Sequence, residues 1–293
     1  MATSVRRMSA ALALIAALST VGACSQASSP ARPAAAPTKA AAAGVAFDQA
    51  DPKTWTLPME AYLPTDAENR QLGRASAALM ESCMHKAGFT AWQPAPDLPK
   101  LGPKTLTDWR YGIHEKALSS KRGYHTDAAE QEAYDVAMQA GALDGTTPEN
   151  AQTRSSCADK TVGALGRTGK TYGELAQQLG NDAYLRAKQE PEVVAAFKQW
   201  SDCMKESGYS YKEPMDANDD QRFSGRDVSR EEIATALADL GCRSRTQVAL
   251  VWYRAEVGLQ QAALEQNAQA LRAERQELDA VVKKAAGVLA DAR

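Results

Sequence analysis

The chain has 293 residues, of which 44% are hydrophobic, and carries 34 Lys and Arg against 36 Asp and Glu, a net charge of −2. Proteins that bind nucleic acid usually present a basic face, so this balance disfavours a nucleic-acid partner and none is expected. The length allows one large domain or two small ones.

The N-terminus has the pattern of an export signal. Arg6 and Arg7 precede an apolar run, 8–21, that is too short to span a bilayer, which predicts a cleaved signal peptide over residues 1–23. Val21-Gly22-Ala23-Cys24 has the form of a bacterial lipobox. We therefore expect Cys24 to carry diacylglyceryl and palmitate-type chains, with membrane lipid as a partner, on the extracytoplasmic face of the cell membrane. An ordinary secretory signal with a chance cysteine is the alternative.

Residues 24–46 are expected to form a disordered tether, because they are almost entirely Ala, Pro, Ser and Thr and offer nothing to bury. Cleavage after residue 23 would leave 32 basic residues against 36 acidic ones, a net charge of −4. The folded part begins near Phe47. We divide it into helical half one (47–170), helical half two (171–243) and a long C-terminal helix (244–293).

Nearly all predicted elements are helices. Thr65-Asp66-Ala67-Glu68 is a capping box that opens a helix to about Ala87, and a proline-rich loop follows over 92–108. Further helices are expected over 126–140, 150–165 and 172–188, and from Pro191 to about Cys203. A second loop over 210–228 precedes a helix from Ser229 to Leu240. Because no convincing strand is present, the predicted fold class is all-α.

Four cysteines remain after Cys24, and their pairing follows from an internal repeat. Cys83-Met84-His85-Lys86-Ala87-Gly88-Phe89 and Cys203-Met204-Lys205-Glu206-Ser207-Gly208-Tyr209 share the form C-M-x-x-x-G-[FY], a helix end with glycine in a left-handed conformation. Each copy is followed by one further cysteine in a helical context. Of three connectivities, we favour Cys83 with Cys157 and Cys203 with Cys242. A redox-active dithiol is the less favoured interpretation of these cysteines.

The stretch from Arg243 onward is expected to be one long helix, in which Val257, Leu264, Leu271 and Leu278 recur every seven residues. This apolar column could pack on the rest of the chain. Beyond Leu271 it could instead contact an envelope protein partner or a second copy.

One segment is rich in side chains that recognise ligands. Trp109, Arg110, Tyr111 and His114, with His125 further on, could line a pocket for an anionic or sugar-like ligand. The alternative is that they form the aromatic floor of a loop that packs between the two repeats. The cysteines and histidines do not recur at ligand spacing, so no metal and no cofactor are expected.

Several of these motifs, in this order, resemble actinobacterial secreted lipoproteins of unassigned function. The resemblance covers about residues 55–270, and rests on Leu57-Pro58-Met59-Glu60-Ala61-Tyr62-Leu63, both Cys-Met motifs, Trp200-Ser201-Asp202, Ala238-Asp239-Leu240-Gly241-Cys242 and the Trp252 helix with Gln260. It implies a cell-envelope lipoprotein and no particular activity.

The common signatures of exported hydrolases are missing, so a non-enzymatic binding or assembly role in the cell envelope is the favoured function. A ligand-receiving lipoprotein of a transporter or sensor is the second hypothesis. A cell-wall hydrolase is the third, and it would require two carboxylates across a cleft.

Overall fold

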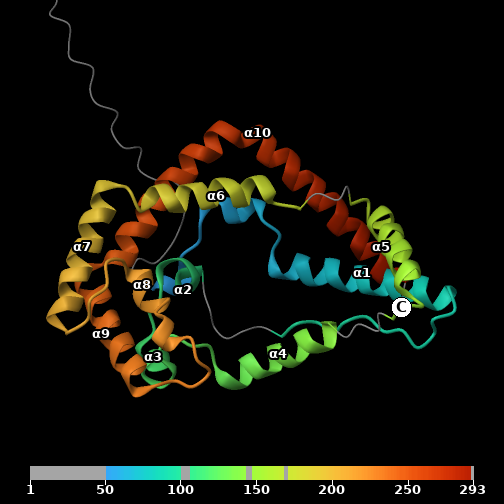
Figure 1. Ribbon diagram of the computed structural model, residues 1–293. Helices are drawn as coiled ribbons and strands as arrows, with labels where there is room; N and C mark the ends of the chain where they lie inside the picture. Colours follow the sequence, from blue (N-terminus) through green and yellow to red (C-terminus); the bar gives the residue numbers. More distant parts are fainter. Residues whose placement is uncertain (1–50, 100–105, 143–146, 168–170, 292–293) are drawn as a thin grey trace, which may run out of the picture. The chain divides into compact units, whose positions relative to one another are not determined.

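The computed structural model describes residues 51–99, 106–142, 147–167 and 171–291, and within these ranges it contains helices and no strand (Figure 1). The predicted all-α class is therefore confirmed. The predicted signal peptide, Cys24 and the tether (1–46) lie outside the described residues. The α-helices are α1 (Asp66–Lys86), α2 (Leu106–Tyr111), α3 (Lys116–Arg122), α4 (Ala128–Ala142), α5 (Ala151–Leu165), α6 (Glu174–Ala187), α7 (Pro191–Glu206), α8 (Pro214–Asn218), α9 (Arg230–Thr246) and α10 (Val248–Asp291). Three short 3₁₀ helices are η1 (Pro52–Thr54), η2 (Pro58–Tyr62) and η3 (Gln221–Phe223).

The repeated motif ends two helices, α1 and α7, in the same way. Gly88 and Gly208 adopt φ angles of 96° and 89°. The Phe89 N–H then donates to the Met84 carbonyl at 3.0 Å, and the Tyr209 N–H donates to the Met204 carbonyl at 2.9 Å. These are the bonds of a Schellman helix end, which explains why glycine and an aromatic residue occur together in both copies.

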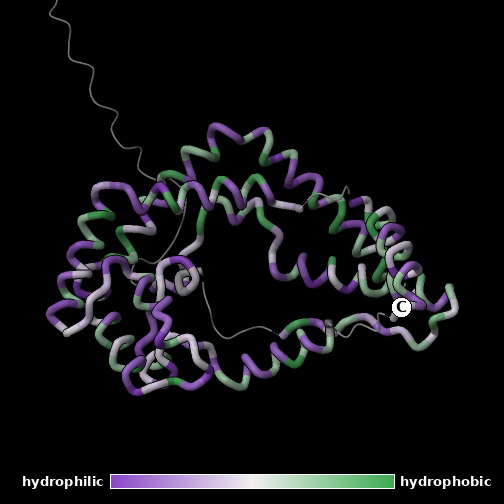
Figure 2. The backbone as a smooth tube through the Cα atoms, in the orientation of Figure 1, coloured by the Kyte–Doolittle hydropathy of each residue, from purple (hydrophilic) through white to green (hydrophobic). Residues whose placement is uncertain are grey.

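Helix α10 supplies core residues along its whole length. It packs against α7, α6 and α1 in turn, and Figure 2 shows hydrophobic and hydrophilic residues alternating along it. Trp252 lies in a cluster with Trp200 and Phe197 of α7. Further along, Leu271 is buried with Met59 and Ala176, and Val281 and Ala285 are buried with Ala75 and Leu165. The chain thus covers much of the predicted heptad column itself, since Val257, Leu271 and Leu278 are buried.

The helix starts follow local capping signals. The Thr65 hydroxyl accepts the Glu68 N–H at 3.2 Å, and the Glu68 carboxylate accepts the Thr65 N–H at 2.7 Å, a complete capping box. Pro191 occupies the first turn of α7, as expected. The Ser229 hydroxyl caps α9 by accepting the Glu232 N–H at 3.0 Å, and the Glu232 side chain is fully buried.

Two sequence predictions of helix limits are wrong. Helix α9 continues past Leu240 to Thr246, and the long helix begins at Val248 rather than near Arg243. Between them Gln247 has a φ of 53°, and its N–H bonds to the Arg243 carbonyl at 2.9 Å. Arg243 is buried and held by contacts from other segments, so packing determines where α9 ends. The sequence contains no glycine or proline at this point that would predict the end of the helix.

The two predicted loops also contain helices. Helix α2 begins at Leu106, inside the expected loop over 92–108, and α8 and η3 lie inside the expected loop over 210–228. Pro214 starts α8, where its fixed φ suits the first helical turn, and the Asp216 carboxylate accepts the Glu213 N–H at 2.9 Å. These helices have three to six residues, which is too short for a periodic apolar pattern to predict.

Candidate functional site

The residues predicted to form a ligand pocket occupy different surroundings. Arg110 and Tyr111, at the end of α2, both bind the carboxylate of Glu256, which is fully buried on α10. Arg110 Nε donates to Glu256 Oε2 at 3.3 Å and a second guanidinium nitrogen contacts Oε1, while the Tyr111 hydroxyl donates to Oε2 at 2.7 Å. Gln260 donates to the same carboxylate at 2.8 Å. Both residues therefore serve a buried polar network.

The network also fixes the neighbouring helices. Arg110 donates to the Gly180 carbonyl of α6 at 3.0 Å, and its guanidinium lies over the Tyr184 ring, 4.6 Å from the centroid. Burial alone would lower the pKa of Arg110, but the bond and charge of Glu256 raise it. Burial raises the pKa of Tyr111 well above its usual value, and the Glu256 carboxylate adds to the shift. Arg110 remains charged and Tyr111 remains a hydrogen-bond donor.

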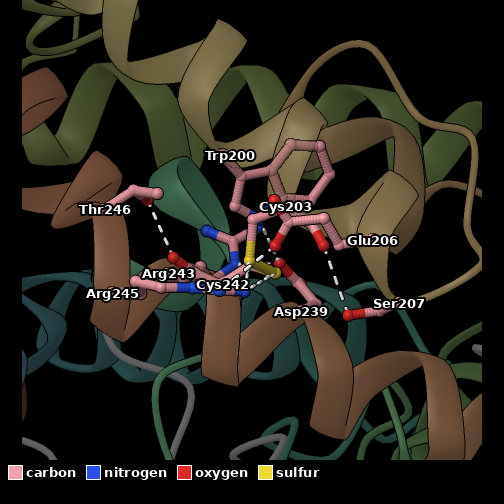
Figure 3. The surroundings of a disulfide bond; sticks show 9 residues. All are labelled: Trp200, Cys203, Glu206, Ser207, Asp239, Cys242, Arg243, Arg245 and Thr246. Carbon is pink, nitrogen blue, oxygen red and sulfur yellow. Dashed lines mark hydrogen bonds and ion pairs between the residues drawn. A yellow bond between two sulfur atoms is a disulfide. The ribbon is translucent and has the colours of Figure 1, made fainter.

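A second buried network surrounds Asp239 on α9. Its carboxylate accepts from Trp200 Nε1 at 2.8 Å, from Arg243 Nε at 2.7 Å and from the Tyr124 hydroxyl at 3.2 Å. Arg243 also donates to the Pro214 carbonyl at 2.9 Å and to the Tyr111 carbonyl. Burial raises the pKa of Asp239, whereas Arg243 and the other donors lower it. Figure 3 shows Arg243, Asp239 and Trp200 beside the Cys203–Cys242 disulfide.

The remaining predicted residues lie elsewhere. His125 contacts Glu232, which is fully buried at the start of α9, through Nδ1 at 2.8 Å, and the Gly225 carbonyl through Nε2 at 2.6 Å. Both ring nitrogens of His125 thus lie within hydrogen-bond distance of an oxygen atom, and the tautomer decides which nitrogen donates. Trp109 is 60% exposed on α2. The five predicted residues thus do not line one pocket.

His114 does line a pocket, of about 390 Å³, between the 3₁₀ helix η1 and the junction of α9 with α10. Its walls are Pro52, Trp55, Ile113, Leu240, Ala249 and Leu250, and its polar groups are His114, Arg243, Ser244 and Gln247. The volume lies within the range of sites for small molecules, and polar and apolar groups share the lining about equally. Gln247 holds the positive φ described above, a conformation that costs free energy in any residue other than glycine.

Both predicted disulfides are present, with Cα atoms 5.7 Å apart in each. Cys203–Cys242 joins α7 to α9 and is buried, and Arg245 lies against both sulfur atoms (Figure 3). Cys83–Cys157 joins α1 to α5 and lines an open groove of about 700 Å³ between these helices.

Sequence reasoning missed the three buried acids, Glu256, Asp239 and Glu232. A signal for two of them was available. Glu256 lies four residues after Trp252 and four before Gln260, on one helix face, and Asp239 lies four residues before Arg243. An acid that interrupts an apolar stripe in this way indicates a buried pair.

Within the described ranges, no helix combines the length and apolarity needed to cross a membrane. The same residues include no group of three or more His, Cys, Asp or Glu side chains placed to hold a metal ion. No protein-family model matches the chain, and no curated protein or solved structure is significantly similar to it.

Proposed function

We propose that this chain is a lipid-anchored, extracytoplasmic protein of the cell envelope that acts by binding a small molecule rather than by catalysis. The observation that carries the binding role is the pocket beside His114. A small molecule with both apolar and polar groups would fit it, since apolar walls lie beside the polar side chains of His114, Ser244 and Gln247.

The anchoring part of the proposal rests on the lipobox pattern at Cys24 and on the two disulfides. Disulfides persist in oxidising compartments outside the cytoplasm, so they agree with export. Replacing the acylated residue, Cys24→Ala, should move the protein from the membrane fraction to the soluble fraction in fractionated cells. Continued membrane association of this variant would contradict the lipid anchor.

The three buried acids favour structural roles over acid–base chemistry. Each faces a basic partner inside the fold: Glu256 faces Arg110, Asp239 faces Arg243 and Glu232 faces His125. A wall hydrolase would need carboxylates that meet a substrate across a cleft. The pocket instead favours the second role expected from the sequence, reception of a ligand for a transporter or sensor.

An assembly role through α10 is the other candidate. Leu271 and Leu278 are fully buried by the chain itself, so a protein partner would have to contact the exposed side of α10, where Arg272 and Gln276 lie. The buried leucine column therefore gives the assembly role no support.

The test compares two phenylalanine variants on α9. Ser244 is exposed at the pocket rim, so Ser244→Phe should narrow the pocket without removing a buried contact. Ala234 is exposed on the same helix and does not line the pocket, so Ala234→Phe is the matched control. In saturation-transfer NMR with a fragment library, fragments that bind the wild type and Ala234→Phe should fail to bind Ser244→Phe. Fragment binding that is equal in all three proteins would refute this pocket as the site.

A further inference from the structure

The two disulfides arise from the same repeated motif but have unlike surroundings. Cys203 and Cys242 are 5% and 1% exposed, and the guanidinium of Arg245 contacts both sulfurs (Figure 3), so burial rather than the lack of a neighbouring cation distinguishes this bond from Cys83–Cys157. Cys157 is 1% exposed, but Cys83 is partly exposed, and both line the open groove between α1 and α5. The groove therefore offers an external thiol a route to Cys83 that the buried pair lacks.

The charged side chains that line the groove are both lysines. Lys86 follows Cys83 by three residues on α1, and Lys160 follows Cys157 by three residues on α5, so each lies on the helix face of its cysteine. Neither lysine forms an ion pair with any residue in the described part of the chain. A neighbouring ammonium group stabilises a thiolate, and a more stable thiolate is a faster leaving group.

We infer that Cys83–Cys157 is a thiol–disulfide exchange site whose substrate is an external dithiol, such as a Cys-x-x-Cys reductase, and that Cys203–Cys242 is a structural bond. The attacking thiolate forms a bond to Cys83 Sγ, the Cys83–Cys157 bond breaks, and its electron pair leaves with Cys157 as a thiolate, about one helical turn before Lys160 on α5. The second thiol of the dithiol, as its thiolate, then displaces the Cys83 thiolate. The dithiol is oxidised to a disulfide, and both cysteines end reduced after taking up two protons. This reaction removes the covalent link between α5 and the end of α1.

The test is graded reduction of the folded full chain with dithiothreitol, followed by alkylation and peptide mass spectrometry. We expect Cys83 and Cys157 to be labelled at least about tenfold faster than Cys203 and Cys242, with the helical circular dichroism signal retained. Equal rates, or faster reduction of Cys203–Cys242, would overturn the inference. So would loss of the helical signal in step with the first reduction, because the reaction would then proceed through unfolding.

The lysines are tested with matched charge changes. Because a leaving thiol of higher pKa leaves more slowly, Lys86→Gln with Lys160→Gln should slow reduction of Cys83–Cys157, by about threefold. Lys116→Gln with Lys212→Gln removes the same charge from exposed positions outside the groove and should leave the rate unchanged. Equal slowing in both double variants would show that net charge, rather than the groove, controls the reaction.

A trapping experiment identifies the attacked sulfur. A Cys-x-x-Cys reductase whose second cysteine is replaced by serine should form a stable mixed disulfide with Cys83. A mixed disulfide with Cys203 or Cys242 instead, or none with the chain, would contradict the assignment.

Discussion

The ion pair between Arg110 and Glu256 offers the sharpest test of the core, because Glu256 is fully buried and the Arg110 side chain is 19% exposed. Arg110→Met removes the charge but keeps an apolar stem that can pack over Tyr184. The buried carboxylate is then left with the neutral donors Tyr111 and Gln260. Removing one partner of a buried pair typically costs about 3–5 kcal/mol, a large part of the about 5–15 kcal/mol that a domain has.

Urea unfolding at pH 7, followed by circular dichroism with the disulfides intact, measures this loss. Arg272→Met, at an exposed position on α10, is the control and should change the free energy of unfolding by less than about 0.5 kcal/mol. Combining Arg110→Met with Glu256→Gln removes both charges and keeps an oxygen acceptor for Tyr111. The double variant should therefore recover about 2 kcal/mol or more of the free energy of unfolding lost in Arg110→Met. A loss below about 1 kcal/mol in Arg110→Met, or no recovery in the double variant, would refute the buried pair.

Two further outcomes follow from α10. Leu271→Ala should lower the free energy of unfolding by about 2–5 kcal/mol because it empties a fully buried position, whereas Leu185→Ala, 56% exposed, should cost far less in the same urea titration. Hydrogen bonds from Arg275 and Thr65 lower the pKa of Glu68 to about 2 in the folded chain. The lowered pKa stabilises the fold above the usual value of 4.5, and this contribution is lost as the pH falls toward 2. Glu68→Gln should therefore flatten the dependence of stability on pH between about 4.5 and 2, and an unchanged acid profile would contradict the Glu68–Arg275 contact.

The features predicted correctly from the sequence are those that local chemistry determines. The Thr65 capping box, Pro191 in a first turn and the glycines of the repeated motif act within one helical turn, and each occurs where the residues indicate. The cysteine pairing was predictable because the repeat places each cysteine in the same local structure. Because both copies of the motif have the same local structure, we expect each motif cysteine to pair in the same way, with the next cysteine along the chain.

What the sequence left open depends on contacts between distant segments. The turn at Gln247 follows from the hydrogen bonds between Arg243 and the carbonyls of residues 111 and 214. No local sequence pattern predicts these bonds. The candidate pocket was only partly predicted for the same reason. Arg110 and Tyr111 are residue types that often bind ligands. Here both instead bind the buried carboxylate of Glu256, about 145 residues further along the chain.

The heptad column of the long helix is compatible with two opposite interpretations. A heptad column is typical both of a coiled-coil surface and of a helix that packs on its own chain, and the residues alone do not distinguish them. Here α1, α5 and α6 cover the column, and α10 contributes Leu271, Val281 and Ala285 to separate core clusters. A chain truncated after Leu264 would expose the partners of these residues, so a binding partner lost on truncation could reflect a damaged core. Substitutions on the exposed side of α10 leave the core intact, and a partner lost through them would identify α10 itself as the contact.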